Sequence, residues 1–292
     1  MNRLLHPKCV WRAFYYGMRW RVRKALRIPE KTNLPVLNSG LDSAVKRHLR
    51  ICETLLKHLP EKHQIEGRVV AEIGCGDCLA AADMMLGLGA SHVHLVEYYR
   101  IHVTPLHREI LKPLIESPKV PNRGEILTVK DPPTLNPEKT TAHQGFLENL
   151  QIKEQIDFVY SFDVVEHVED LDGFFGCCSR MLRPGGLSLH KFDLSGHEFF
   201  EDPMPPLDFQ TYPTWLFNII FPKYRRAVGN FADTIFDSMK KNGLEIQAVI
   251  PIRTAEPDYL EKIWPKLRKE ARLRDRRIVS MLDLIVISQK GF

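Results

Sequence analysis

Two glycines and two acidic residues, close together in the first half of the chain, could form a site for a nucleoside-type ligand. Gly74 and Gly76 follow the apolar run 69–73 directly, as when a buried parallel strand ends in a tight loop. Glycine lets the backbone turn sharply and lets a ligand lie against it. Glu97 ends the next apolar run, about 20 residues later, where a carboxylate can accept hydrogen bonds from ribose hydroxyls. Glu72, inside the first strand, suits a cationic or hydroxyl-bearing ligand better than a phosphate.

The glycine spacing differs from that of dinucleotide sites. Such sites usually carry Gly-x-Gly-x-x-Gly, whereas Leu79 stands at the third glycine position here. The apolar segment 79–88 is predicted to be a helix that ends at Gly87 and Gly89. Strand, loop and helix together therefore predict a nucleotide-type pocket that would serve a pyrophosphate poorly.

Three segments resemble the motifs of class I S-adenosylmethionine (SAM) methyltransferases. Residues 72–76 with Glu97 are similar to that family's first motif and the acidic motif after it. Residues 157–168 resemble its fourth strand and the following helix, and 182–187 resemble the turn before its fifth strand. The segments stand in the family's order. One departure is Asp77-Cys78, where the family often has a small residue and a third glycine.

The resemblance implies an α/β fold: a Rossmann-like, seven-stranded, mostly parallel sheet with helices on both faces and an antiparallel last strand. Apolar periodicity predicts strands at 69–73, 93–96, 156–162, 187–192, 244–250 and 281–288. It predicts helices at 41–59, 79–88, 105–116, 170–182, 231–242 and 257–274, the last of them broken at Pro265. The third strand is either 125–129 or 141–145, and we favour the second.

Proline placement and patterning divide the chain into parts. Residues 1–40 form a basic, aromatic N-terminal extension, and 41–292 form the methyltransferase-like domain. Within that domain, residues 195–229 lack the regular apolar periodicity of helices and strands, and prolines interrupt an aromatic-rich segment there. We expect this insertion to be a lid over the substrate side of the sheet.

The resemblance implies SAM as the cofactor and places its contacts at the ends of the first four strands. By that analogy Phe146 and Leu147 would bracket the adenine, although two ordinary core residues are the alternative. The end of the fourth strand offers oxygen atoms to the cofactor's ammonium group. The expected cofactor-binding residues are Glu72, Gly74, Cys75, Gly76, Glu97, Tyr98, Phe146, Leu147, Ser161, Phe162 and Asp163.

Methyl transfer to a hydroxyl needs a base on the substrate side that removes the proton. His190 is our first choice, because its strand is expected to end beside the pocket, with Lys191 or Asp193 as a polar neighbour. His167 and His197 lie on other segments that reach this side. The alternative for each histidine is a hydrogen-bonded structural role.

A metal site is a competing interpretation of the same region. Asp163, Glu166 and His167 put three oxygen or nitrogen ligands within one helical turn, and Mg²⁺ or Mn²⁺ would suit them. His190 or His197 is a possible fourth ligand. The segment resembles a Glu-x-x-Glu-His version found in some metal-dependent methyltransferases, but here Asp163 replaces the first glutamate, and we favour no metal. Cys75 and Cys78 form one Cys-x-x-Cys pair with no second pair, so we interpret them as loop and core thiols.

Composition excludes several classes of protein. Six cysteines among 292 residues form no disulfide framework, and no apolar run approaches the length of a membrane span. We therefore expect a cytoplasmic protein. Residues 1–30 interleave aromatic and cationic residues, as in a helix that lies on the inner face of a membrane. The alternative, which we rank slightly ahead, is a helix packed on its own domain or on a partner subunit.

The leading functional hypothesis is a SAM-dependent methyltransferase acting on a hydroxyl of a small molecule or glycan. The segment 190–197 with the aromatic insertion resembles methyltransferases of bacterial surface-polysaccharide synthesis. One alternative is RNA or ribosome methylation, because arginines cluster in 3–27 and 266–277. Strand four lacks the Asn/Asp-Pro-Pro-aromatic signature of base-methylating enzymes, so nucleic acid is not the expected partner. A third hypothesis is a non-catalytic SAM-fold binding subunit.

Overall fold

The computed structural model describes most of residues 40–292. The described ranges are 40–59, 65–76, 79–98, 100–152, 155–196, 205–211 and 230–292, together with Trp11, Tyr15, Met18 and Val22. His197, Asp77, Cys78 and most of the expected extension and lid lie outside these ranges.

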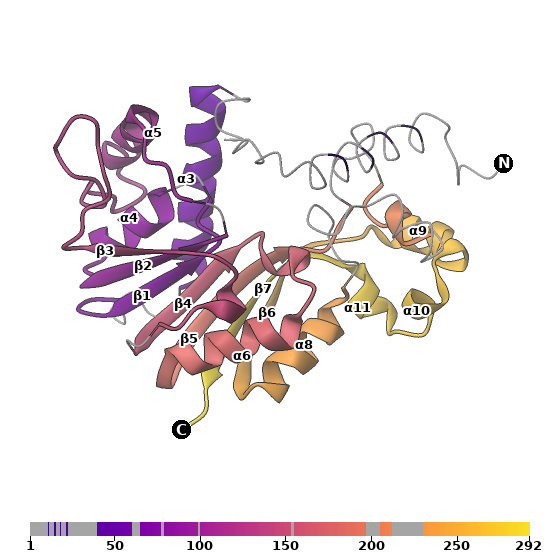
Figure 1. Ribbon diagram of the computed structural model, residues 1–292. Coiled ribbons are helices and arrows are strands. Elements are labelled where there is room, and N and C mark those ends of the chain that lie inside the picture. The colour runs from indigo at the N-terminus through magenta and orange to yellow at the C-terminus, as the bar shows by residue number, and fades with distance from the viewer. Residues whose placement is uncertain are drawn as a thin grey trace.

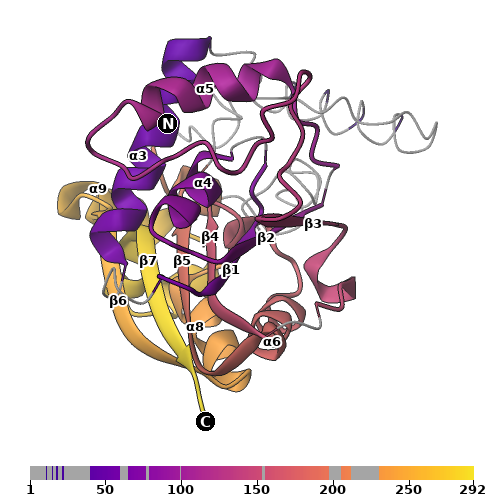
Figure 2. The ribbon, with the colours of Figure 1, turned by 90° about the vertical axis from the view of Figure 1, so that its left-hand side faces the viewer.

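A seven-stranded sheet forms the centre of the domain, in the order β3-β2-β1-β4-β5-β7-β6 (Figures 1 and 2). β7 pairs antiparallel with both neighbours, and the other pairs are parallel. This arrangement confirms the expected Rossmann-like α/β fold with an antiparallel last strand. The strands are β1 (Val69–Ile73), β2 (His92–Glu97), β3 (Thr140–Gln144), β4 (Ile156–Phe162), β5 (Leu182–Asp193), β6 (Leu244–Thr254) and β7 (Met281–Lys290).

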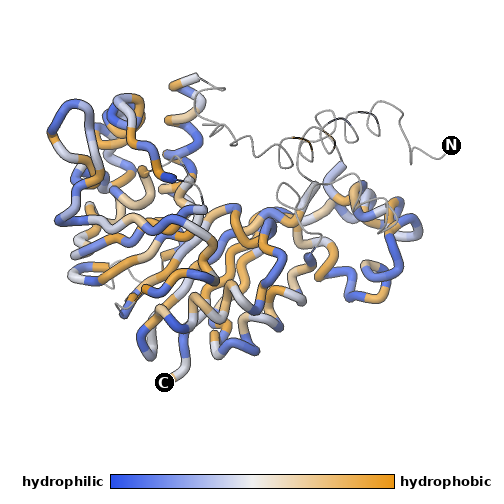
Figure 3. Tube along the Cα trace, in the orientation of Figure 1, coloured by the Kyte–Doolittle hydropathy of each residue, from blue (hydrophilic) through white to orange (hydrophobic). Residues whose placement is uncertain are grey.

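Helices cover both faces of the sheet. α3 (Leu41–His58), α4 (Ala80–Gly87) and α5 (Pro105–Ile115) lie on one face, and α6 (Leu171–Met181) and α8 (Ala232–Lys241) lie on the other (Figure 1). Each face has its own apolar core, because successive strand residues point to opposite sides. The central strands of the sheet are largely hydrophobic, whereas α3 and α5 carry many hydrophilic residues (Figure 3). None of the helices described is long and apolar enough to cross a membrane.

The predicted third strand is confirmed at 140–144, the second of the two alternatives. β5 begins at Leu182, five residues before the predicted start, because Leu182 already pairs with Ile156 ahead of a register shift. The helix predicted over 257–274 is interrupted around Pro265, as expected, and again after Lys266. It is three short pieces, α9 (Pro257–Ile263), η6 (Trp264–Lys266) and α10 (Lys269–Arg272), and α11 (Arg276–Ser280) follows.

These short helices connect β6 to β7 and pack with part of the predicted lid. Leu207 belongs to the same small core as Leu267 and Leu282. Its N–H donates to the hydroxyl of Tyr259 at 2.9 Å, and the N–H of Arg268 donates to the carbonyl of Gln210 at 2.9 Å. The described piece of the 195–229 insertion is therefore anchored to the β6–β7 connection.

The proline-rich excursion 117–139 is anchored by one buried carboxylate. Asp83 of α4 accepts hydrogen bonds from the N–H groups of Arg123, Gly124 and Ile126 at 2.8–3.1 Å. Gly87, one turn further on, lies so close to the carbonyl of Pro121 that a Cβ would overlap it. These contacts hold the excursion against α4, all of whose residues are buried.

Candidate functional site

Gly74 and Gly76, in the loop that forms the corner after β1, are glycines for different structural reasons. Gly74 has φ of +72°, and an added Cβ would overlap Cγ2 of Val164 in the segment after β4. Gly76 has φ of +57°, and no described atom lies within 4 Å of where its Cβ would be. Packing therefore requires the first glycine, whereas the second leaves open backbone against which a ligand can lie.

Glu97 lies beside this open backbone. Its Oε2 accepts a hydrogen bond from the N–H of Gly76 at 2.7 Å. Its carbonyl accepts from the N–H of Gly145 at 2.9 Å, so the ends of β1, β2 and β3 are joined at one residue. The ends of these three strands therefore lie next to one another.

An exposed aromatic pair continues the same edge. The rings of Tyr98 and Phe146 lie 4.4 Å apart between centroids, and both residues are about half exposed, 49% and 56%. Exposed rings at strand ends are suited to stack on a flat heterocycle. Leu147 does not share this exposure. It is buried in the α6-side core with Ile73, so the partner that faces Phe146 is Tyr98 rather than the predicted Leu147.

Glu72 is buried and bonded within the protein. Its Oε2 accepts a hydrogen bond from the hydroxyl of Tyr160 at 3.0 Å, across the β1–β4 pairing. Burial raises the pKa of Glu72 to about 8, the bond from Tyr160 opposes the rise, and the charge of Glu97 adds to it. A cationic ligand at this edge would favour the ionised carboxylate and lower that pKa.

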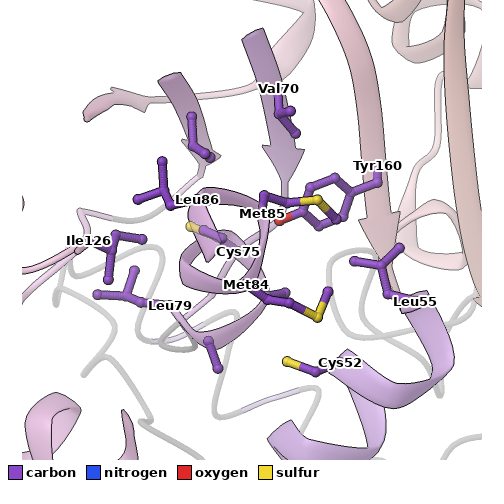
Figure 4. Packing of buried hydrophobic residues seen from close by; sticks show 14 of the residues in the cluster. Cys52, Leu55, Val70, Cys75, Leu79, Met84, Met85, Leu86, Ile126 and Tyr160 are labelled. Carbon is purple, nitrogen blue, oxygen red and sulfur yellow. The ribbon is translucent and has the colours of Figure 1, made fainter. Parts of the chain in front are cut away.

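The side chains of three predicted cofactor contacts are engaged elsewhere in the structure. The side chain of Cys75 is buried in the α3–α5 core, among residues such as Met85 and Leu86 (Figure 4). Only its backbone can face a ligand at the corner. The hydroxyl of Ser161 bonds to Nδ1 of His190 at 2.8 Å on the α6 side of the sheet. Phe162 is half-buried and packs against the α3–α5 core.

His190 occupies the core between β5 and α6. It has no exposed surface, and the rings of Phe174 and Phe175 meet it edge-on with centroids 5.9 and 5.6 Å away. Its Nε2 has no hydrogen-bond partner among the described residues, and burial lowers the pKa of His190 to about 3. A base must reach its substrate. The placement is that of a structural histidine, so the preferred base assignment is not supported.

A network of charges lies at the carboxyl ends of β4 and β5 and joins them to β6 and β7. Lys191 forms ion pairs with Asp163 and with Asp283, the latter at 3.2 Å. Asp283 in turn pairs with Arg253 at 2.6 Å, and Arg253 also contacts Asp193 at 3.3 Å. Burial alone would lower the pKa of Lys191, but Asp163, Asp283 and Glu166 together raise it. Lys191 is therefore a cation that holds the site together.

Asp163 has a left-handed backbone, with φ of +55°, directly after β4. The ion pair with Lys191 and the hydrogen bond from its own N–H to the carbonyl of Lys191 at 3.0 Å hold it there. Asp193 accepts hydrogen bonds from the N–H and the hydroxyl of Ser195 at 2.8 and 2.5 Å. Both carboxylates predicted for the site are thus committed to contacts within the network.

The possible metal ligands do not converge. Glu166 is buried, and its Oε1 accepts from the N–H of Asp193 at 3.2 Å. Burial and the carboxylate of Asp163 raise the pKa of Glu166 well above its ordinary value. His167 is half-buried at the end of η4 (Val165–His167). Within the described ranges, no three His, Cys, Asp or Glu side chains are grouped to hold a metal ion.

Sequence reasoning missed three members of the site: Tyr160, Arg253 and Asp283. Tyr160 could have been found from β4, since it lies two residues before the end of a strand expected beside β1. Arg253 and Asp283 carry no such signal, because their meeting depends on the register of β6 against β7.

Comparison with known proteins agrees with this geometry. The family described as "Methyltransferase domain" matches residues 71–189. A ubiquinone biosynthesis O-methyltransferase of Chelativorans sp. (strain BNC1) is 32% identical over 123 residues, which is 42% of this chain and 39% of that protein. One of Bradyrhizobium sp. (strain ORS 278) is 44% identical over 41 residues, 14% of this chain and 16% of that protein. The matched stretches thus span well under half the length of these curated relatives.

Among solved structures, a geranyl diphosphate methyltransferase in complex with GPP and sinefungin has the same fold. It aligns with a TM-score of 0.50 and 15% identity, over 82% of this chain and 77% of that one. The sheet order, the open Gly76 corner beside Glu97 and the family match all fall on one region. Residues 71–189 thus carry a methyltransferase domain, within a sheet that has the Rossmann-like methyltransferase fold.

Proposed function

We propose that the protein transfers the methyl group of SAM to a hydroxyl of a small molecule. One observation carries the proposal: Glu97, the open backbone of Gly76 and the exposed Tyr98–Phe146 pair lie together at one sheet edge. Glu97 would hold the ribose and the two rings the adenine. Glu72 would face the positively charged end of the cofactor.

The acceptor hydroxyl would enter from the side of the 205–211 segment and the β6–β7 connection. Since His190 is closed within the core, His167 is our candidate to accept the proton, because it is only half-buried and follows the Asp163 corner. In-line displacement then needs the hydroxyl oxygen held opposite the sulfur, while the base removes its proton. Asp193 contributes by fixing Ser195 and Arg253 at the rim.

The partial relatives named for ubiquinone biosynthesis favour a hydroxyl on an aromatic ring as the first acceptor to test. A sugar hydroxyl, as in surface polysaccharides, is the second acceptor. The experiment is transfer of a labelled methyl group from SAM to a panel of catechols and of simple glycosides. Turnover of the catechols alone supports the first acceptor, and turnover of the glycosides alone supports the second. SAM binding without turnover on either class would favour a non-catalytic binding role and contradict the proposal.

The same proposal includes contact with an anionic membrane surface through the N-terminal extension. Trp11, Tyr15, Met18 and Val22 are helical and 42–68% exposed, and their spacing places them on one helix face. The sequence around them supplies arginines that can bind lipid headgroups. Sedimentation with phosphatidylglycerol vesicles tests it: Met18→Glu should reduce binding several-fold, and binding unchanged in that variant would contradict it.

A further inference from the structure

A cavity of about 350 Å³ opens at the edge of the sheet opposite Gly76 and Glu97. Its walls come from the amino ends of β4 and β5 and from the last residues of β7, near the C-terminus in Figure 2. β4 is seven residues long, which separates the two edges by about 20 Å. Ligands of open parallel sheets bind at the carboxyl edge, so the proposed cofactor does not account for this cavity.

Two guanidinium groups and one carboxylate form the mouth of the cavity. Oδ1 of Asp157 pairs with Arg68 at 3.2 Å and with Arg183 at 2.5 Å. Its Oδ2 accepts the N–H of Val69 at 2.9 Å. One carboxylate thus faces two cations, and the mouth keeps one net positive charge.

Each guanidinium also keeps N–H donors beyond those bonds. Arg68 uses one nitrogen toward Asp157, and Arg183 uses Nε toward Asp157 and Nη1 toward the carbonyl of Pro184 at 3.4 Å. Both side chains are 40–44% exposed. A planar guanidinium fork with donors to spare is suited to a carboxylate.

The interior of the cavity is mostly apolar, and Gln247 and Gln289 add polar groups to its lining. Its apolar residues come from the end of α3, from β4, β5 and β7, and from the turn before β1: Leu59, Ile65, Phe158, Leu187 and Ile287. An apolar interior with a few polar groups at the opening is the usual design of a small-molecule site, and this volume is at the small end of that range.

We propose that this cavity binds a small monoanion with an apolar body, of the aryl or medium-chain carboxylate class. The carboxylate pairs with the spare donors of Arg68 and Arg183, and the apolar body lies on Leu187 and Phe158. A purely structural role for the charges would tie β1 to β4 and β5 through Asp157 and would bind no ligand. A titration with a carboxylate ligand separates the two roles, because only the binding role produces a measurable affinity.

The experiment is calorimetric titration of the full chain with octanoate, and with octanol as the neutral analogue. Arg183→Gln removes one guanidinium and leaves Asp157 its bonds to Arg68 and Val69. Leu187→Phe fills the interior and leaves the charges intact. Arg180→Gln, an exposed arginine of α6 outside the cavity, is the matched control.

The proposal expects octanoate affinity to fall at least tenfold in Arg183→Gln and in Leu187→Phe and to stay unchanged in Arg180→Gln. Octanol should bind at least tenfold more weakly than octanoate. The proposal is overturned if the wild type does not bind octanoate at millimolar concentration. It is also overturned if either cavity variant binds octanoate as tightly as the wild type does, or if the wild type binds octanol as tightly as octanoate. If Arg183→Gln fails to fold, Leu187→Phe and the octanol comparison still decide. Titration with SAM tests the carboxyl edge of the sheet, at Gly76 and Glu97. Failure of the carboxylate-binding proposal can therefore be distinguished from failure of the proposed methyltransferase function.

Discussion

Gly76 and Glu97 are joined by a hydrogen bond of 2.7 Å between the backbone N–H of one and the carboxylate of the other. The bond links the loop after β1 to the tip of β2, two segments 21 residues apart. It holds a carboxylate beside Gly76, where the described backbone of the corner is open. This relationship fixes the position of a carboxylate at the carboxyl edge of the sheet, as the proposed cofactor site requires.

Glu72→Gln should stabilise the protein at neutral pH. The pKa of this carboxyl is raised from 4.5 to about 8. Between these values the folded state keeps a proton that the unfolded state has lost, so stability falls as pH rises through that window. Glutamine removes the titration and can still accept from Tyr160, so we expect a gain of about 2 kcal/mol at pH 7.

Urea unfolding at pH 4.5 and pH 7 measures this effect. The gain should shrink at pH 4.5, where about half of the unfolded carboxyls also hold the proton. Glu245→Gln, on an exposed position of β6, is the control and should change little. An equal effect of Glu72→Gln at both pH values would contradict the raised pKa.

His190 should make the fold sensitive to acid. Burial lowers its pKa from 6.5 to about 3, so below pH 6.5 the unfolded state binds a proton that the folded state refuses. Stability is fully present above pH 6.5 and is lost as pH falls toward 3, by up to about 1.4 kcal/mol per pH unit. His190→Gln should flatten the slope of unfolding free energy against pH in this window, while His48, whose pKa burial lowers to about 4, keeps part of it.

The same variant separates the two roles of His190. If the histidine is structural, His190→Gln keeps a hydrogen-bonding group for Ser161 and retains turnover within a few-fold once folded. A loss of a hundredfold or more in kcat with unchanged stability would restore it as the base.

Gly74→Ala should destabilise far more than Gly243→Ala. Both glycines have nearly the same φ, +72° and +74°, so both variants carry similar backbone strain of about 1 kcal/mol. Only at Gly74 does the new Cβ overlap Val164; at Gly243 no described atom lies within 4 Å. We expect an added cost of about 1–3 kcal/mol at Gly74. Thermal unfolding measures it, and Val164→Ala in the Gly74→Ala background should recover part of the loss. Equal costs at the two glycines would be inconsistent with the packing at Val164.

Asp83→Ala should cost about 3 kcal/mol or more, because three N–H groups of the 117–139 excursion lose their acceptor. Asp83→Asn, which keeps one acceptor oxygen, should cost less. Hydrogen exchange localises the effect: the amides of Arg123, Gly124 and Ile126 should lose protection first. Protection of these amides unchanged in Asp83→Ala would contradict their anchoring by Asp83.

The sequence was sufficient to predict the strand ends that carry Gly76 and Glu97, because a parallel sheet collects those ends at one edge. It was not sufficient to predict which face of β5 each residue occupies. Side chains alternate along a strand, so one residue of register decides between Lys191, which reaches the charge network, and His190, which enters the core. The meeting of Arg253 with Asp283 depends in the same way on how β6 pairs with β7.

Two residues predicted to contact the cofactor, Leu147 and Ser161, are buried, and the sequence alone did not indicate this. Leu147 and Phe146 are neighbours in the chain, yet one is in the core and the other is exposed beside Tyr98. Ser161 has the residue type of a ligand contact, but its hydroxyl is committed to His190. Residue type and motif position set the candidates, and only the packing of α6 against the sheet separates them.

Calorimetric titration with SAM tests the cofactor edge most directly, with the wild type, Glu97→Ala and the exposed helical control Glu109→Ala compared side by side. We expect wild type and Glu109→Ala to bind one equivalent with the same affinity, and Glu97→Ala to bind at least tenfold more weakly. No heat with the wild type, or the same affinity in Glu97→Ala, would contradict the assignment of this edge as the cofactor site.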